Sequence, residues 1–149
     1  MSQNNIKITP YHPKYAEQTV NMWRASKEQA IGQNEIHSFE SQIDFLNNIL
    51  PKEFDIDLAI IDKKVVGMIA YNESEVSQLY IHIEYQRMGI GKILLEKAKE
   101  QSRGRLTLYT FEVNEKAQRF YEKHGFKIIG RGHENEKNLP DIQYEWIFE

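Results

Sequence analysis

The stretch Gln86-Arg87-Met88-Gly89-Ile90-Gly91-Lys92 stands between an apolar run typical of a strand and a run with helical periodicity. A strand–turn–helix junction leaves backbone N–H groups unpaired at the helix N-terminus, where the helix dipole adds positive character. Glycine permits unusual backbone angles and lets a ligand or another helix approach closely. The stretch therefore predicts either a phosphate-binding turn or a tight turn with close helix packing. Arg87 and Lys92 favour the phosphate, because both add positive charge.

Two common nucleotide-binding glycine motifs do not fit this stretch. A Rossmann fingerprint needs a third glycine, and here the helix continues with Lys92-Ile93-Leu94. A Walker loop needs a four-residue spacer and Ser or Thr after its lysine, whereas Ile93 follows Gly91-Lys92. Both kinds of nucleotide site are excluded.

The composition narrows the class of protein. The chain has 149 residues, 40% hydrophobic and 28% charged, which suits one domain over residues 1–149. The absence of cysteine excludes disulfides and a cysteine nucleophile and fits a cytoplasmic location. No signal peptide and no apolar run of about 20 residues is present, so we expect no membrane partner. A net charge of −3 argues against nucleic acid, and the five histidines lack metal-ligand spacing, so no metal is predicted.

Hydrophobic periodicity predicts the order of elements. A strand ending at Pro10 is followed by a helix over Pro13–Ala30 and a second helix that Ser38 caps and Pro51 ends. Further strands are predicted at 56–61, 64–71, 76–83, 106–111, 126–130 and 142–148, with helices from residue 90 to about 104 and after residue 114. Residues 62–64 are typical of a hairpin turn. The order β-α-α-β-β-β-α-β-α-β-β predicts an α/β or α+β fold, with one mixed sheet covered by helices.

A second motif lies downstream, with the pattern Asn-x-x-Ala-x-x-Phe-Tyr-x-x-x-Gly-Phe over residues 114–126. Together with the glycine stretch it closely resembles the GNAT superfamily of acyl-CoA-dependent N-acyltransferases, in particular small bacterial single-domain members. The resemblance covers the whole element order, with motif-level matching from Leu79 to Gly130. It implies a mostly antiparallel sheet, splayed in the middle, and acetyl-CoA as co-substrate. Ile83 and Met88 depart from the family pattern, and we expect the Met88 side chain to point outward.

The resemblance also implies which residues bind coenzyme A. The backbone amides of the glycine turn would cradle the pyrophosphate, and the preceding strand would present backbone groups to the pantetheine. The N–H of Ile81 would face the thioester oxygen. The implied cofactor-binding residues are Leu79, Tyr80, Ile81, Gln86, Arg87, Met88, Gly89, Ile90, Gly91, Lys92, Asn114 and Phe120.

Catalysis of amine acetylation needs a proton for the departing thiolate and a route for the amine proton. The resemblance implies that Tyr121 is the acid, since its pKa of about 10 keeps its hydroxyl protonated at neutral pH. Its helical periodicity alone is equally typical of a core tyrosine. Glu75 is the first candidate for the base, while His82 and bulk water remain alternatives.

The predicted function is transfer of an acetyl group from acetyl-CoA to a primary amine of a small molecule or peptide, by direct attack in a ternary complex, in a monomer or homodimer. The alternative is a non-catalytic acyl-CoA sensor or interaction module with the same fold. The segments that would set acceptor specificity offer Trp23, His37, Phe39, Tyr71 and the stretch Gly132–Asp141, although residues of these types are more often core or solvated surface.

Overall fold

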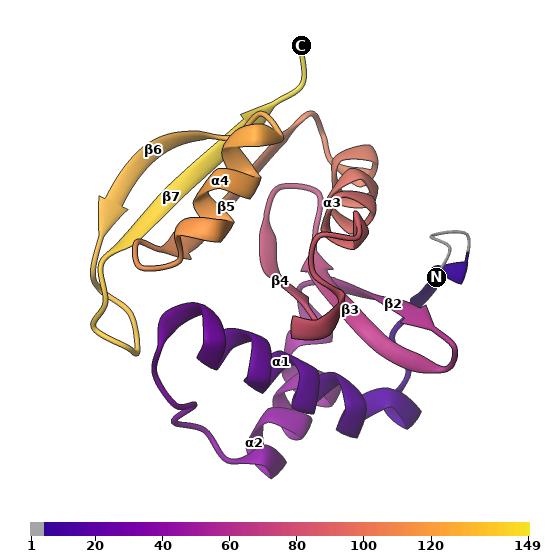
Figure 1. Cartoon of the computed structure of the whole chain (residues 1–149). Coiled ribbons are helices and arrows are strands. Elements are labelled where there is room, and N and C mark those ends of the chain that lie inside the picture. Colours follow the sequence, from indigo (N-terminus) through magenta and orange to yellow (C-terminus); the bar gives the residue numbers. More distant parts are fainter. Residues whose placement is uncertain (1–4) are drawn as a thin grey trace.

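The structure, a computed structural model, describes residues 5–149 as two antiparallel sheets with helices packed against them (Figure 1). The strands are β1 (Lys7–Pro10), β2 (Asp55–Ile61), β3 (Lys64–Tyr71), β4 (Val76–Ile81), β5 (Arg105–Phe111), β6 (Lys127–Gly132) and β7 (Asp141–Ile147). The helices are α1 (Ala16–Ile31), α2 (Phe39–Asp44), α3 (Ile90–Gln101) and α4 (Glu115–Lys123). The predicted order of elements and the α+β class are confirmed.

The two sheets meet at one end and diverge from there. The first sheet has the order β1-β2-β3-β4 and the second the order β5-β7-β6, each antiparallel throughout. Within residues 5–149, a single parallel bridge between Glu75 and Thr107 joins strand β4 to strand β5. Beyond it β4 and β5 splay apart, so the parallel component of the predicted mixed sheet is confined to this bridge.

Several boundaries differ from the sequence prediction, because local side-chain caps compete with the regular elements. Helix α1 begins at Ala16 rather than Pro13, since the side chain of His12 accepts a hydrogen bond from Lys14 N and starts a 3₁₀ turn at Pro13–Tyr15. Strand β4 ends at Ile81 rather than residue 83, since the His82 side chain accepts from Glu84 N and begins another 3₁₀ turn. The turn between β2 and β3 has two residues, Asp62 and Lys63, both with positive φ.

The first sheet is buried on both faces, which explains the almost continuous apolar run of its central strands. On β2, Leu58 belongs to a cluster under α1 and α2, whereas Ile61 belongs to a second cluster that includes residues of α3 and α4. The second cluster also contains Leu108 of β5 and Tyr144 of β7, so it joins the two sheets beneath the splay. Helices α1 and α2 thus cover one face of the first sheet, and α3 covers the other.

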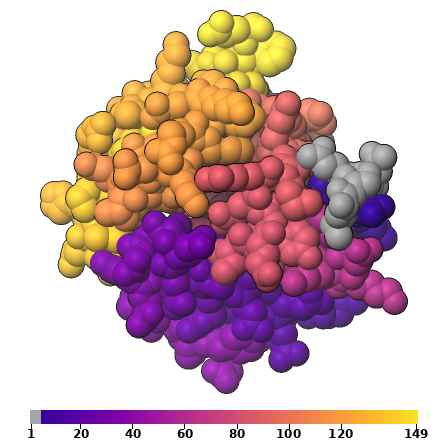
Figure 2. All heavy atoms as spheres, in the orientation of Figure 1, coloured from indigo at the N-terminus to yellow at the C-terminus, as the bar shows by residue number. Residues whose placement is uncertain are grey.

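Segments far apart in the chain come together around this splay. Figure 2 shows the α1–α2 region in purple, the α3 region in salmon and the α4 region in orange meeting on one face. No helix within residues 5–149 combines the length and the apolar character needed to cross a membrane.

Candidate active site

The glycine stretch forms the turn into helix α3. Arg87 and Gly89 both have positive φ, 68° and 82°, and Gly89 stands at the helix N-cap position. A glycine offers no side chain to cap the helix, and Ile93 N donates to Gly89 O at 3.2 Å. The backbone N–H groups of residues 90–92 therefore have no acceptor within the helix, and they point outward from its N-terminus. Arg87 and Lys92 are exposed beside them, so the turn offers amide donors and positive charge to an anion.

The two glycines of this turn serve different purposes. Gly89 supplies the left-handed backbone conformation. Gly91 instead provides close packing, because a Cβ there would lie 3.2 Å from Cζ of Phe120 on helix α4. The tight turn with close helix packing is therefore present, and phosphate binding by the same turn stays a prediction. The expectation that Met88 points outward is wrong, since Met88 is partly buried and packs against the apolar cluster beneath α3.

Strand β4 presents its outer edge to the splay. His82 N donates to Val66 O of β3 at 2.8 Å, and successive N–H groups of a strand point to opposite sides. The N–H groups of Leu79 and Ile81 are therefore directed away from β3, toward β5. The carbonyl of Ile81 accepts from Ser26 Oγ of helix α1 at 2.9 Å and from Gln86 Nε2 at 3.2 Å, which fixes this end of the strand.

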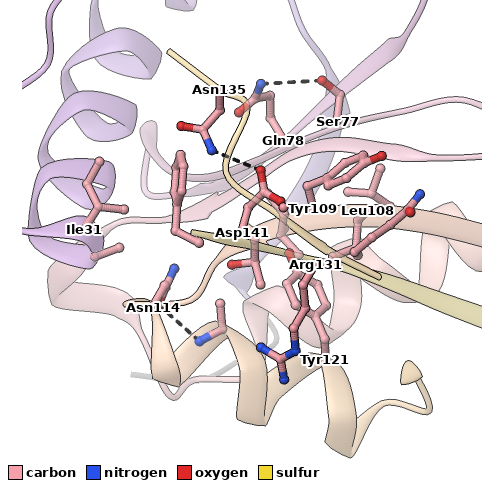
Figure 3. Close-up of a pocket in the computed structure, with 18 of the residues that line it drawn as sticks. Ile31, Ser77, Gln78, Leu108, Tyr109, Asn114, Tyr121, Arg131, Asn135 and Asp141 are labelled. Carbon is pink, nitrogen blue, oxygen red and sulfur yellow. Dashed lines mark hydrogen bonds between the residues drawn. The ribbon is translucent and has the colours of Figure 1, made fainter. Parts of the chain in front are cut away.

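A cavity of about 820 Å³ occupies the splay (Figure 3). Its walls come from the end of α1, from β4 and β5, from α4 and from the β6–β7 segment. The sequence-predicted residues in its lining are Leu79, Tyr80, Asn114, Tyr121, Gly132, His133, Glu134, Asn135 and Asp141. The fold therefore brings the predicted acid, the predicted pantetheine strand and the predicted acceptor stretch around one space.

Tyr121 reaches this cavity from helix α4. The residue is only 7% exposed, and its ring packs edge-on against Phe120 and Phe126. Burial raises the pKa of its hydroxyl, and neighbouring Tyr80 raises it further, so the group stays protonated. The hydroxyl has no hydrogen-bond partner within residues 5–149.

Other buried tyrosines behave differently. Tyr71 OH donates to Asp57 Oδ2 and Tyr144 OH donates to Glu122 Oε2, each at 2.7 Å. A core tyrosine normally finds such a partner. The unpaired hydroxyl of Tyr121, placed on a cavity, is therefore available to a ligand. Tyr80, whose hydroxyl is likewise without a partner in the described part of the chain, lines the same cavity.

Asn114 is both a cap and a lining residue. Its Oδ1 accepts from Ala117 N at 3.2 Å, which caps helix α4, and its side chain borders the cavity. Its amide nitrogen stays free for another acceptor.

The two side chains considered as bases lie outside the cavity. Glu75 stands where β4 begins, and its backbone N–H donates to Asn72 Oδ1 at 2.9 Å. His82 lies beside a smaller hollow next to α1, edge-on to Tyr85. Burial lowers the pKa of His82, and nearby Lys64 lowers it further. The structure therefore brings neither side chain to the Tyr121 hydroxyl.

Most of the single residues expected to contact the acceptor serve other purposes. Trp23 is buried between Phe45 and Tyr80, Phe39 packs with it in the cluster under α1 and α2, and Tyr71 is buried against Asp57. His37 pairs through Nε2 with Glu136 Oε2 at 2.8 Å, which links the α1–α2 loop to the β6–β7 loop. Sequence reasoning missed several lining residues because no local pattern brings a helix end and four strands together: Ala30, Ile31, Ser77, Gln78, Tyr109, Arg131 and Gln143.

Comparison with known proteins settles the family. A model of the acetyltransferase (GNAT) family matches residues 17–126, the span that carries α1, the splay and the Tyr121 helix. The chain belongs to the GNAT acetyltransferase family. It is thus an acetyltransferase of the acyltransferase class, and family membership implies the use of acetyl-CoA.

Named relatives of this acetyltransferase act on amines. The peptidyl-lysine N-acetyltransferase YjaB of Salmonella typhimurium is 28% identical over 136 residues, which cover 91% of this chain and 92% of the relative. A spermidine N(1)-acetyltransferase of Thermoplasma acidophilum is 33% identical over 122 residues, covering 76% of this chain and 71% of its own. A PaiA N-acetyltransferase from T. acidophilum, solved in complex with coenzyme A, has a TM-score of 0.76 at 24% identity, covering 99% of this chain and 100% of that one. That last likeness shows the shared fold.

Proposed function

We propose that residues 1–149 form one N-acetyltransferase domain that transfers the acetyl group of acetyl-CoA to a primary amine, by direct attack within a ternary complex. The observation that carries this proposal is the Tyr121 hydroxyl, which has no hydrogen-bond partner within residues 5–149 and lies on a cavity lined by β4, α4 and the β6–β7 segment. Acetyl-CoA would supply an activated acetyl group as its thioester.

The residues present fit coenzyme A as a ligand. The amides at the start of α3, with Arg87 and Lys92 beside them, suit its pyrophosphate. The outward-directed N–H groups of Leu79 and Ile81 suit amide and thioester oxygens lying along β4. Phe120 would contribute by holding α4 against Gly91, which keeps the turn next to the Tyr121 helix.

Tyr121 would act on the leaving sulfur. As the amine nitrogen forms its bond to the carbonyl carbon, the carbon–sulfur bond breaks and negative charge collects on sulfur. The Tyr121 hydroxyl donates a hydrogen bond to that charge. Since burial raises the pKa of Tyr121 above its ordinary value, the hydroxyl is protonated when the reaction begins. It donates its proton to the sulfur as charge develops there, and water returns a proton to Tyr121 afterwards. The proton that the amine loses leaves through water, or through Glu75 by way of water.

The relatives support a broad class of acceptor, the primary amines, and no single compound. One relative is named for peptidyl-lysine and another for spermidine, and both names describe primary amines. We propose a small molecule or a peptide that presents such an amine to the cavity.

The test is release of free coenzyme A from acetyl-CoA, measured with and without a panel of amines, with the acetylated product identified by mass spectrometry. Amine-dependent release supports the enzyme. Binding of acetyl-CoA with no amine-dependent release across peptides, diamines and monoamines would favour a sensor or interaction module instead.

A further inference from the structure

One carboxylate in the cavity is held in place without a positive charge beside it. Asp141 is the first residue of β7, where it lies opposite Phe111 of β5 and Gly132 of β6. Its side chain lines the cavity, as Figure 3 shows. Asp141 thus belongs to the part of the cavity wall that the β6–β7 segment forms.

The carboxylate of Asp141 is oriented by Asn135. Asn135 Nδ2 donates to Asp141 Oδ2 at 3.0 Å and to Leu139 O at 2.8 Å. Asn135 Oδ1 accepts from the backbone N–H of Lys137 at 3.0 Å and of Leu139 at 3.3 Å. Three hydrogen bonds to the backbone therefore hold the Asn135 amide, and a fourth joins it to the carboxylate. Such preorganisation is what a recognition group needs.

The nearest candidates for a cationic partner are engaged elsewhere. Arg131 also lines the cavity, but it pairs with Ile142 in the ladder, so its side chain leaves the sheet on the face opposite to that of Asp141. It approaches Glu112 at 3.5 Å. Lys137 Nζ donates to Asn34 O at 3.0 Å. Within residues 5–149, no ion pair involves Asp141.

A glycine keeps the second oxygen of this carboxylate open. A Cβ on Gly132 would lie 3.3 Å from Asp141 Oδ1, so any larger residue would crowd that oxygen. Glu134, a further lining residue, adds negative charge to the same mouth. The site thus combines an oriented carboxylate, an open oxygen and two carboxylates against one arginine in the cavity lining.

We infer that Asp141 binds a second ammonium group on the acceptor, which makes an aliphatic diamine or polyamine the preferred substrate class. Asn135 is a positioning residue that acts through Asp141. This inference rests on the proposed function, because it concerns the acceptor of that reaction. A charge-assisted hydrogen bond of this kind discriminates strongly against an acceptor that lacks the second charge.

The test compares two acceptors of equal carbon length, 1,4-diaminobutane and 1-aminobutane, by coenzyme A release. In the wild-type protein we expect kcat/KM to be at least tenfold higher for the diamine. Asp141→Asn is expected to reduce that ratio by about tenfold or more, mainly through a higher KM for the diamine. Asn135→Ala should reduce the ratio in the same direction, and higher salt should raise the KM for the diamine in the wild-type protein.

Glu145→Gln is the matched control. Glu145 lies on the same strand and face as Asp141, but it pairs with Arg105 and does not line the cavity, so its loss should leave the ratio unchanged. Equal kcat/KM for both amines, or an unchanged ratio in Asp141→Asn, would overturn the inference and leave the proposed function intact. Turnover of neither amine, with no thermal shift from the diamine in the presence of coenzyme A, would count against the inference. Failure with peptide amines as well would count against the proposed function.

Discussion

Replacing Tyr121 with phenylalanine removes one oxygen atom and leaves the packing of the ring intact. The ring keeps its contacts with Phe120 at 5.3 Å and Phe126 at 5.5 Å between centroids. No hydrogen bond within residues 5–149 is lost. The free energy of unfolding should therefore change by less than about 0.5 kcal/mol, which is roughly 2 °C or less in melting temperature for a chain of this size.

The effect on catalysis should be far larger. A hydrogen bond to a charged group contributes about 1.5–3 kcal/mol, and here it forms only as charge develops on the sulfur. At about 1.36 kcal/mol per tenfold change in rate, kcat should fall by roughly 10- to 150-fold. The thermal shift produced by coenzyme A should be almost unchanged. The assay is steady-state coenzyme A release with any accepted amine, alongside the melting temperature of the same preparation.

Tyr71→Phe is the matched control for this change. Tyr71 OH donates to buried Asp57, so its removal should cost about 1–3 kcal/mol of stability and leave kcat unchanged. Removal of the same hydroxyl group is thus expected to lower kcat at Tyr121 and to lower stability at Tyr71. A kcat for Tyr121→Phe within about twofold of the wild-type value would refute the assignment of Tyr121 as the acid.

Three further predictions concern the glycine turn and the base. Gly89→Val should keep the chain folded but abolish the thermal shift produced by coenzyme A, because valine does not tolerate the positive φ that orients the amides; a normal shift would count against this role. Gly91→Val should lower the melting temperature because its side chain collides with Phe120, and Phe120→Leu in the same chain should restore part of the loss, whereas no restoration would point away from packing. Glu75→Gln should reduce kcat less than Tyr121→Phe does, since water offers another route for the amine proton, and an equally severe loss would show that Glu75 is the principal base.

The sequence predicted those features that depend on local periodicity or on contiguous motifs. The order of helices and strands followed from apolar spacing, and the α3 turn and the Tyr121 helix followed from the two motifs. Met88 was placed wrongly because the apolar cluster it enters contains residues from β2, β5 and β7, which no local pattern brings together. The purpose of Gly91 likewise depends on Phe120, which is distant in the chain.

The acceptor end was the least predictable part of the site. Lys137 and the Asn34 carbonyl lie 103 residues apart in the chain, yet they form a hydrogen bond between the α1–α2 loop and the β6–β7 segment. Trp23 and Tyr71 are typical of a binding surface by residue type, but both are buried in the core. Single aromatic residues carry little information about which face they will occupy, because cores and binding sites favour the same side chains.

The bridge between Glu75 and Thr107 has a consequence for the length of the acyl group that this enzyme can accept. Beyond that bridge the two halves are held by apolar packing, including Leu108 and Tyr144, rather than by a backbone ladder. The width of the opening is therefore set by side-chain size, and a strand ladder would have fixed it at one spacing of about 4.8 Å. Smaller side chains along the splay could admit a longer acyl chain without breaking one backbone hydrogen bond. Single substitutions along the splay can therefore change the width of the opening, in evolution or in protein engineering.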